Sequence, residues 1–225
     1  MAIKNEFIKA QLDMQKQICL TNQFNAIKYV AGVDLAYYNV DGTEHAICAI
    51  VVIDYETKEV VEIASYTAQT TVLYIPGCLS FREVPIFLKA NELLNTKVDL
   101  YIFDGNGYLH PRNMGLATHA GIILDLPTIG VAKNYFKVQD TDYIMPAPIK
   151  GAYENIIING KVYGCVLRSR TNVKPIFVSI GNNIDLQTSR DIVIHLTSKE
   201  SRIPLPTRLA DIEANRLRKI AQTIK

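Results

Sequence analysis

The sequence lacks a long apolar run, and its N-terminus lacks an apolar core. None of the runs in the 225 residues approaches the roughly 18 apolar residues that a membrane helix needs. The first residues, MAIKNEFIKAQLDMQKQ, carry charges where a secretory signal peptide would be apolar. We therefore expect a cytoplasmic protein without a membrane segment.

Cysteines are few, and they are not spaced as metal or redox motifs. The four residues Cys19, Cys48, Cys78 and Cys165 are scattered, and no C-x-x-C pair occurs. This spacing argues against a zinc knuckle and against a thioredoxin-type motif. We interpret them as buried or idle thiols in a reducing compartment.

A strong charge bias is also missing. The net charge is +2 and the pI is near 8.2, which is compatible with nucleic-acid binding but does not by itself indicate it. With 48% hydrophobic and 20% charged residues, the chain has the composition of an ordinary globular protein. No internal repeat, low-complexity tract, linker or heptad pattern appears, so we expect a single domain over residues 1–225 and a monomer.

The order of apolar segments predicts an α/β fold. Residues 28–38, 44–55 and 60–72 are strand-like and are joined by short polar turns, which is typical of an antiparallel three-strand meander. Later strands and helices alternate, which predicts a central mixed β-sheet flanked by helices. The expected helices cover residues 4–18, 81–94, 114–126, 185–195 and 207 onward, and the expected later strands cover residues 98–104, 127–133, 154–168 (a hairpin) and 174–182.

The stretch TVLYIPGCLSFRE contains a turn with an unusual tip. Pro76 and Gly77 fit the two central positions of a type II turn, because Pro presets φ and Gly accepts a positive φ. Tyr74 and Ile75 precede them, although turn tips are normally polar. Their side chains either fold back onto the core or are exposed for a function.

Three acidic residues are candidates for a metal site. Asp34 lies inside the apolar segment AGVDLAYY, where a carboxylate is costly to bury unless it is paired or binds a metal. Asp104 ends another strand, and the two carboxylates would lie side by side if these strands pair in parallel. Glu83 could complete an oxygen cluster suited to Mg²⁺ or Mn²⁺. Alternatively, Asp34 pairs with a lysine, Asp104 caps a turn, and Glu83 is a first-turn helix residue.

Three basic residues stand out less clearly. Lys133 ends a buried strand in GVAKN, where an apolar or turn residue is more usual. His110 and His119 are nine positions apart and do not form a zinc pattern.

Several of these segments, taken together and in order, resemble one family. YIPGCLSFRE and DGNGYLHPRNMGLATHAGIILDLPTIGVAKN look like endonuclease V, the deaminated-base repair nucleases of the ribonuclease H-like fold. The likeness is dense from Val30 to Asn134, begins with GVDLA, and thins to LPTRLADIEANRLRK near the C-terminus.

The resemblance implies roles for individual residues. Asp34, Glu83 and Asp104 match the family's metal-binding carboxylates, and Lys133 matches a lysine near the scissile phosphate. Asp211 stands where some relatives carry His, so it is either a fourth member of the metal site or a plain helix residue. The residues implied in DNA contact include a strand-separating wedge, motif histidines and a base pocket: Tyr74, Ile75, Pro76, Gly77, Leu79, His110, Arg112, Gly115, Leu116 and His119. Asn113 and Asn134 depart from the basic and small residues expected at their positions.

The activity implied is that of a Mg²⁺-dependent (or Mn²⁺-dependent) DNA repair endonuclease. The family cleaves the second phosphodiester bond 3′ to deoxyinosine and leaves 3′-hydroxyl and 5′-phosphate ends. An aromatic residue on a stiff turn suits this task, because a base that is taken out of the stack leaves a gap to be filled. Two alternatives stay open: a nuclease acting on inosine in RNA, and a non-catalytic nucleic-acid-binding relative.

Overall fold

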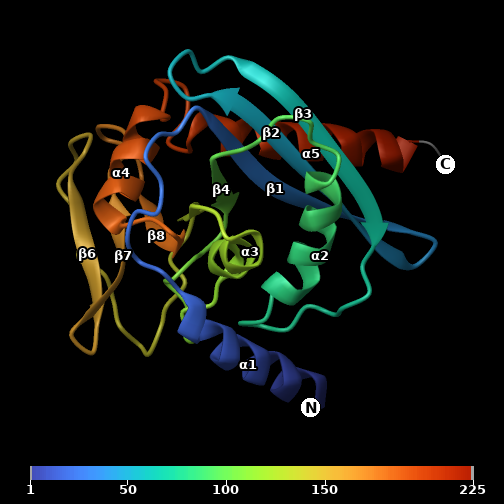
Figure 1. Cartoon of the computed structure of the whole chain (residues 1–225), viewed down its shortest axis with the longest axis horizontal. Helices are drawn as coiled ribbons and strands as arrows, with labels where there is room; N and C mark the ends of the chain where they lie inside the picture. The colour runs from blue at the N-terminus through green and yellow to red at the C-terminus, as the bar shows by residue number, and fades with distance from the viewer. Residues whose placement is uncertain (1, 224–225) are drawn as a thin grey trace.

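The structure is a computed structural model that describes residues 2–223. Its eight strands form one mixed sheet in the order β3-β2-β1-β4-β5-β8-β7-β6 (Figure 1). The strands are β1 (Tyr29–Val40), β2 (Thr43–Asp54), β3 (Val60–Gln69), β4 (Leu100–Asp104), β5 (Thr128–Ala132), β6 (Tyr153–Ile158), β7 (Lys161–Leu167) and β8 (Ile176–Asn182). The α-helices are α1 (Ala2–Met14), α2 (Ser80–Asn91), α3 (Leu116–Leu124), α4 (Leu186–His195) and α5 (Leu205–Thr223).

The sheet confirms the predicted meander and the parallel pairing beside it. β1, β2 and β3 pair antiparallel, while β1 pairs with β4 and β4 with β5 in parallel. The β1–β4 register matches Val30 with Leu100 and Val33 with Phe103. Asp34 and Asp104 are the next residues of the two strands, so they lie side by side where β4 ends and β1 continues.

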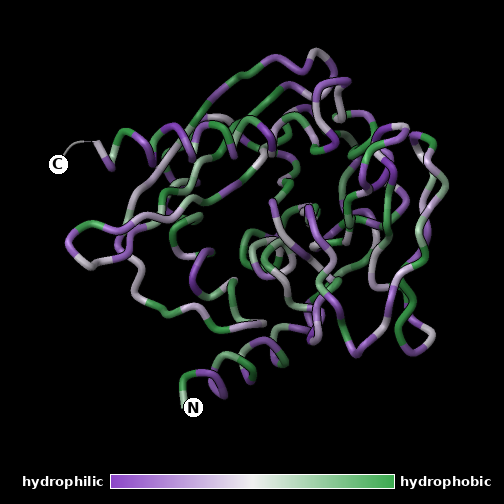
Figure 2. Tube along the Cα trace, turned by 180° about the vertical axis from the view of Figure 1, so that it is seen from behind, coloured by the Kyte–Doolittle hydropathy of each residue, from purple (hydrophilic) through white to green (hydrophobic). Residues whose placement is uncertain are grey.

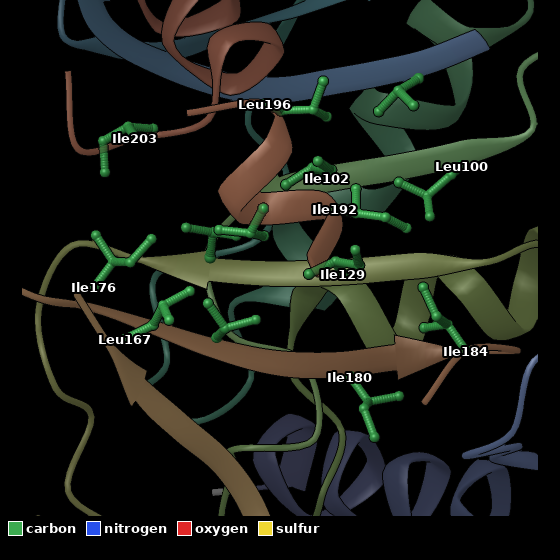
Figure 3. Close-up of a cluster of buried hydrophobic side chains, with 14 of the residues drawn as sticks. Leu100, Ile102, Ile129, Leu167, Ile176, Ile180, Ile184, Ile192, Leu196 and Ile203 are labelled. Atoms are coloured by element: carbon green, nitrogen blue, oxygen red, sulfur yellow. The ribbon is translucent and has the colours of Figure 1, made fainter. Parts of the chain in front are cut away.

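Helices cover both faces of the sheet because β1, β4 and β5 are apolar on both sides. One core joins alternate residues of these strands to α4 and α5, and Figure 3 shows it around Leu100, Ile102, Ile129 and Ile192. The residues between them pack in a second core against α2 and α3. Hydrophobic segments therefore run through the interior, while α1 and α5 alternate between hydrophobic and hydrophilic residues (Figure 2).

The first turn of α5 packs directly on β1. A Cβ atom on Gly32 would lie 2.0 Å from the backbone carbon of Pro206, so a side chain at this position would force the helix away. This close approach brings α5 over the middle of β1. It places Asp211, one and a half turns into the helix, above Asp34.

The N-terminal helix differs from its prediction. The expected helix over residues 4–18 is instead α1, followed by a 3₁₀ turn at Gln15–Gln17 and an extended Ile18. The helix buries a polar residue in place of its apolar neighbour, because Gln11 is fully buried whereas Leu12 is 48% exposed. The other predicted elements are present, with boundaries shifted by a few residues.

The structure also bears on the expectations for membrane helices and for the cysteines. None of the helices between residues 2 and 223 combines the length and apolar content that a membrane crossing requires. The four cysteines are free thiols, and Cys48, Cys78 and Cys165 are buried as expected.

Candidate metal centre and nucleic-acid interface

Three carboxylates from separate elements converge where the middle of β1 lies beside the carboxyl end of β4. Asp34, Asp104 and Asp211 each offer an oxygen, and these oxygens all lie within 4.8 Å of one another. Oxygen-only clusters of this kind are the ligands that hard divalent cations prefer. The side chain of Asp211 faces the other two carboxylates. This geometry favours a place for Asp211 in the metal site over the alternative of a plain helix residue.

The charge balance of the cluster supports a cation site. The Nζ atom of Lys133 lies 2.5 Å from Oδ2 of Asp104 and 3.7 Å from Oδ1 of Asp211. Lys133 is the sole salt-bridge partner of this cluster among the described residues, so one positive charge faces three carboxylates. The sequence also allowed a pair between Asp34 and a lysine. In the structure, Lys133 pairs with Asp104 and Asp211 instead.

The pKa of Asp34 reflects this excess of negative charge. Burial and the charge of Asp104 raise it to about 8, while Lys133 opposes the rise and Asp211 adds to it. Burial alone would lower the pKa of Lys133, but its hydrogen bond and its attraction to Asp104 raise the pKa instead. A divalent cation between the three carboxylates would offset the repulsion between them. The donor set therefore fits the Mg²⁺ or Mn²⁺ that the family resemblance implies.

Glu83 lies near this cluster but outside the group of three. It sits in the first turn of α2, is 7% exposed, and accepts a hydrogen bond of 2.7 Å from the Tyr37 hydroxyl. Burial raises its pKa to about 7, although Tyr37 and Arg82 act in the opposite direction. The structure thus confirms the position of Glu83 in the helix but does not bring it into contact with the carboxylate cluster.

The Tyr-Ile-Pro-Gly segment is an exposed, well-formed turn. The Cys78 amide donates to the Ile75 carbonyl at 2.9 Å, and Gly77 has a φ of +76°, as the type II prediction requires. Tyr74 is 63% exposed, so its ring does not fold back onto the core. Of the two readings of the sequence, the structure supports exposure for Tyr74, while Ile75 is half-buried.

A cavity of about 140 Å³ opens beside this turn. Its walls include the three residues expected in the base pocket, Leu79, Gly115 and Leu116, together with Tyr74 and Gly77 of the expected wedge and the motif histidine His110. Gly105 also lines it and directly follows Asp104, so the cavity and the carboxylate cluster are neighbours along β4. Phe136 is a further wall that the sequence did not single out.

The two motif histidines are buried beside the cavity and are neutral near neutral pH. Burial lowers the pKa of His110 to about 4, and the nearby Arg112 charge acts in the same direction. Burial also lowers the pKa of His119 to about 4. The His119 Nδ1 atom lies 2.8 Å from the hydroxyl of Ser80, whereas His110 contacts the Gly77 carbonyl. Both histidines therefore support the turn and the start of α2.

Sequence reasoning missed two polar residues that hold these parts together. Gln11 is buried against the turn, and its signal was present, because it is on the same helix face as Phe7 and Ile8. Tyr37 was read as an ordinary strand residue, and no local pattern marks its contact with Glu83.

Comparison with known proteins gives a consistent result. The Endonuclease V family model matches residues 12–212. Endonuclease V of Bacillus thuringiensis is 53% identical over 216 residues, which cover 95% of this chain and 92% of that protein. The crystal structure of Endonuclease V from Bacillus subtilis superposes with a TM-score of 0.96 at 45% identity, covering 99% of this chain and 94% of the other.

A more distant solved structure is that of Ciona intestinalis Endonuclease V in complex with a 24mer DNA containing an inosine followed by a ribo-adenosine. It is similar with a TM-score of 0.84 and 26% identity, and each chain is covered completely. The expected ribonuclease H-like class, a mixed sheet flanked by helices, agrees with these structures. From its sequence and its fold, this chain belongs to the Endonuclease V family of endonucleases.

Proposed function

We propose that the chain is a metal-dependent endonuclease that cuts DNA at the second phosphodiester bond 3′ to a deoxyinosine. The observation that carries this proposal is the adjacency of the Asp34–Asp104–Asp211 cluster and the cavity beside the Tyr74 turn. The inosine-containing DNA bound by the Ciona intestinalis relative supports the choice of lesion. The products would carry 3′-hydroxyl and 5′-phosphate ends.

The carboxylates would hold Mg²⁺, or Mn²⁺ in its place. Asp34, Asp104 and Asp211 would supply the charged oxygens, and Glu83, which feels the charge of Asp104, would orient the site from the adjacent helix. A bound divalent ion supplies a water of lowered pKa and stabilises charge on the phosphoryl oxygens. The bond that breaks joins phosphorus to the 3′ oxygen, and the attacking water oxygen becomes part of the 5′-phosphate.

Lys133 would bind the phosphate beside the metal. Its ammonium group contacts Asp104, and its side chain is 38% exposed. A phosphate oxygen arriving next to Asp104 would therefore meet a positive charge. That contact positions the scissile bond and neutralises charge as the phosphoryl group reacts.

The turn and the cavity would read the lesion. Tyr74 would stack in the gap left by the displaced base, and the Pro76–Gly77 turn would keep the tip stiff. The displaced hypoxanthine would enter the cavity, whose walls include Leu79 and Gly115–Leu116. Hypoxanthine lacks the 2-amino group of guanine, so a close-fitting wall would exclude guanine by its shape.

A nicking assay on matched duplexes tests the proposal. Duplex DNA with one deoxyinosine should be cut in Mg²⁺ at one position on the 3′ side, while the same duplex with adenine should remain intact. An RNA strand with one inosine, assayed in parallel, tests the alternative that the chain is a nuclease acting on inosine in RNA. Failure to cut either inosine substrate, with Asp104→Asn as the blank, would leave a binding protein as the better description.

The remaining expectations belong to the same proposal. We propose that residues 1–225 act as a single Endonuclease V-like domain, as a monomer, in the cytoplasm. Size-exclusion chromatography with light scattering would test the monomer directly.

A further inference from the structure

The carbonyl oxygen of Gly77, at the end of the exposed turn, receives three side-chain donors. Arg112 Nη2 lies 2.6 Å away, Gln11 Nε2 lies 3.0 Å away, and His110 Nε2 lies 3.1 Å away. These donors come from α1 and from the segment before α3, which are about a hundred residues apart in sequence. A single carbonyl is therefore fixed from two independent parts of the molecule.

Gln11 connects the two parts. It is the one buried residue of α1 and is 0% exposed. Besides the Gly77 carbonyl, its Nε2 atom donates to the Met114 carbonyl at 3.3 Å, and its Oε1 atom accepts from Arg112 Nε at 2.5 Å. Because a buried amide must use its donors and acceptor, this geometry selects Gln over an apolar residue of similar size.

His110 is held as one tautomer by its neighbours. Its Nδ1 atom accepts from the backbone amides of Arg112 at 3.2 Å and Met114 at 3.4 Å. The proton of the neutral ring is therefore on Nε2, which donates to the Gly77 carbonyl. His110 thus acts here as a fixed donor to the turn.

The N-terminal end of the loop, at Val72, is held by a separate contact. In addition, α1 packs against α2 on the same side of the molecule. Arg82 donates to the Val72 carbonyl at 3.1 Å and pairs with Glu44. Phe7 of α1 stacks on Phe81 of α2 with ring centroids 4.2 Å apart. Figure 1 shows α1 below α2 and α3. Between the two anchored carbonyls, Leu73 and Tyr74 are 84% and 63% exposed.

We propose that Gln11, His110 and Arg112 form a clamp on the Gly77 carbonyl that positions Tyr74 for insertion into DNA. The clamp makes α1 part of lesion recognition, although no residue of α1 touches the cavity. A free loop would lose conformational freedom on insertion, whereas an anchored turn has lost it already, so the clamp raises affinity for the lesion. This inference rests on the proposed role of Tyr74 and concerns how that role is supported.

Gln11→Met tests the clamp, because it keeps the size of the side chain and removes its polar atoms. Gln15→Met is the matched control: Gln15 is one turn further along and bonds to the Arg112 carbonyl and Asn113 Oδ1, but not to Gly77. Affinity for inosine duplex and for undamaged duplex is measured by fluorescence anisotropy in Ca²⁺, with single-turnover cleavage in Mg²⁺.

For Gln11→Met we expect the preference for inosine DNA to fall about tenfold, equivalent to roughly 1.4 kcal/mol. The cleavage rate at saturating protein and the Mg²⁺ requirement should stay near wild type. Gln15→Met should keep the preference. In a Tyr74→Ala background, Gln11→Met should add little, because the clamp acts through that ring.

Three results would overturn the clamp: equal weakening on both duplexes, an equal effect of Gln15→Met, or additivity with Tyr74→Ala. If Gln11→Met does not fold, Gln11→Glu replaces it, since a carboxylate still accepts from Arg112 but cannot donate to the Gly77 carbonyl. Absence of any inosine preference in the wild type would refute the proposed function instead, so the two failures are distinguishable.

Discussion

The ammonium of Lys133 lies 2.5 Å from Asp104 and 3.7 Å from Asp211, so a cation already occupies the rim of the carboxylate cluster. We expect this side chain to bind the scissile phosphate and to stabilise charge that develops there. Lys133→Met should lower the single-turnover cleavage rate about 100-fold or more, the usual effect of losing one such group.

The control for this change is Lys137→Met. Lys137 forms an exposed pair with Asp142 at 2.9 Å, and its loss should leave the rate unchanged. Affinity for uncut DNA, measured in Ca²⁺, should fall far less than the rate in Lys133→Met. An unchanged rate in Lys133→Met would place the phosphate elsewhere.

Asp34 gives a prediction that combines stability and metal binding. Its pKa is about 8 in the folded protein and 3.8 in the reference state, so the folded state binds the extra proton. Its contribution to stability is present at low pH and is lost as the pH rises through about 8. Asp34→Asn should therefore raise the melting temperature of the metal-free protein by at least about 3 °C at the alkaline end, on the order of 1 kcal/mol.

The same variant should lose cleavage and its response to metal. Mg²⁺ should raise the melting temperature of the wild type, because it binds the folded state, and should not raise that of Asp34→Asn. Asp142→Asn, at an exposed position, should behave as the wild type in both measurements. A wild-type melting temperature that ignores Mg²⁺ would contradict the metal site.

The parts of this site that could be predicted from sequence are those fixed by neighbouring strands. Asp34 and Asp104 follow from parallel pairing, because the register of two apolar strands puts Asp34, inside β1, beside Asp104, the last residue of β4. Asp211 stayed open, since its place depends on α5 crossing β1 at Gly32, a contact that no local pattern encodes. Gln11 was overlooked because a polar residue in a helical stripe looks like a surface residue until its buried partners are known.

Asp211 differs from the other two ligand candidates because it comes from a helix. If it binds the metal, Asp211→Ala should raise the Mg²⁺ concentration for half-maximal cleavage at least about tenfold, equivalent to roughly 1.4 kcal/mol of binding. Asp211→His should retain more activity in Mn²⁺ than in Mg²⁺, because imidazole is a poor ligand for Mg²⁺. Asp191→Ala on α4 is the control, and a titration of Asp211→Ala that superimposes on the wild type would remove Asp211 from the site.

The two buried histidines predict acid sensitivity. Burial lowers the pKa of His110 and of His119 from 6.5 to about 4, so the unfolded chain binds more protons in that interval. Stability should therefore fall as the pH drops from 6.5 towards 4, by up to about 3 kcal/mol for each histidine. Urea unfolding across this range should show a smaller loss of stability with falling pH in His119→Asn than in His45→Asn. The Asn side chain at position 119 keeps an acceptor or donor for Ser80.

Tyr74 allows the recognition mechanism to be separated from folding. Its ring is 63% exposed, so Tyr74→Ala should leave the melting temperature almost unchanged. Its affinity for inosine DNA should nevertheless fall by about 1–3 kcal/mol, the usual value of one aromatic–base stack. Tyr74→Phe should bind as the wild type does, because stacking needs the ring and not the hydroxyl.

Leu73→Ala is the matched control for Tyr74, since Leu73 is its neighbour on the loop and is 84% exposed. Loss of affinity in both variants would indicate general contact of the loop with DNA, whereas loss in Tyr74→Ala alone indicates insertion of the ring. At saturating protein, the cleavage rate of Tyr74→Ala should remain within about tenfold of the wild type, because the carboxylates and Lys133 are intact. A destabilised Tyr74→Ala protein with unchanged affinity would show that the ring packs in the fold and does not enter DNA.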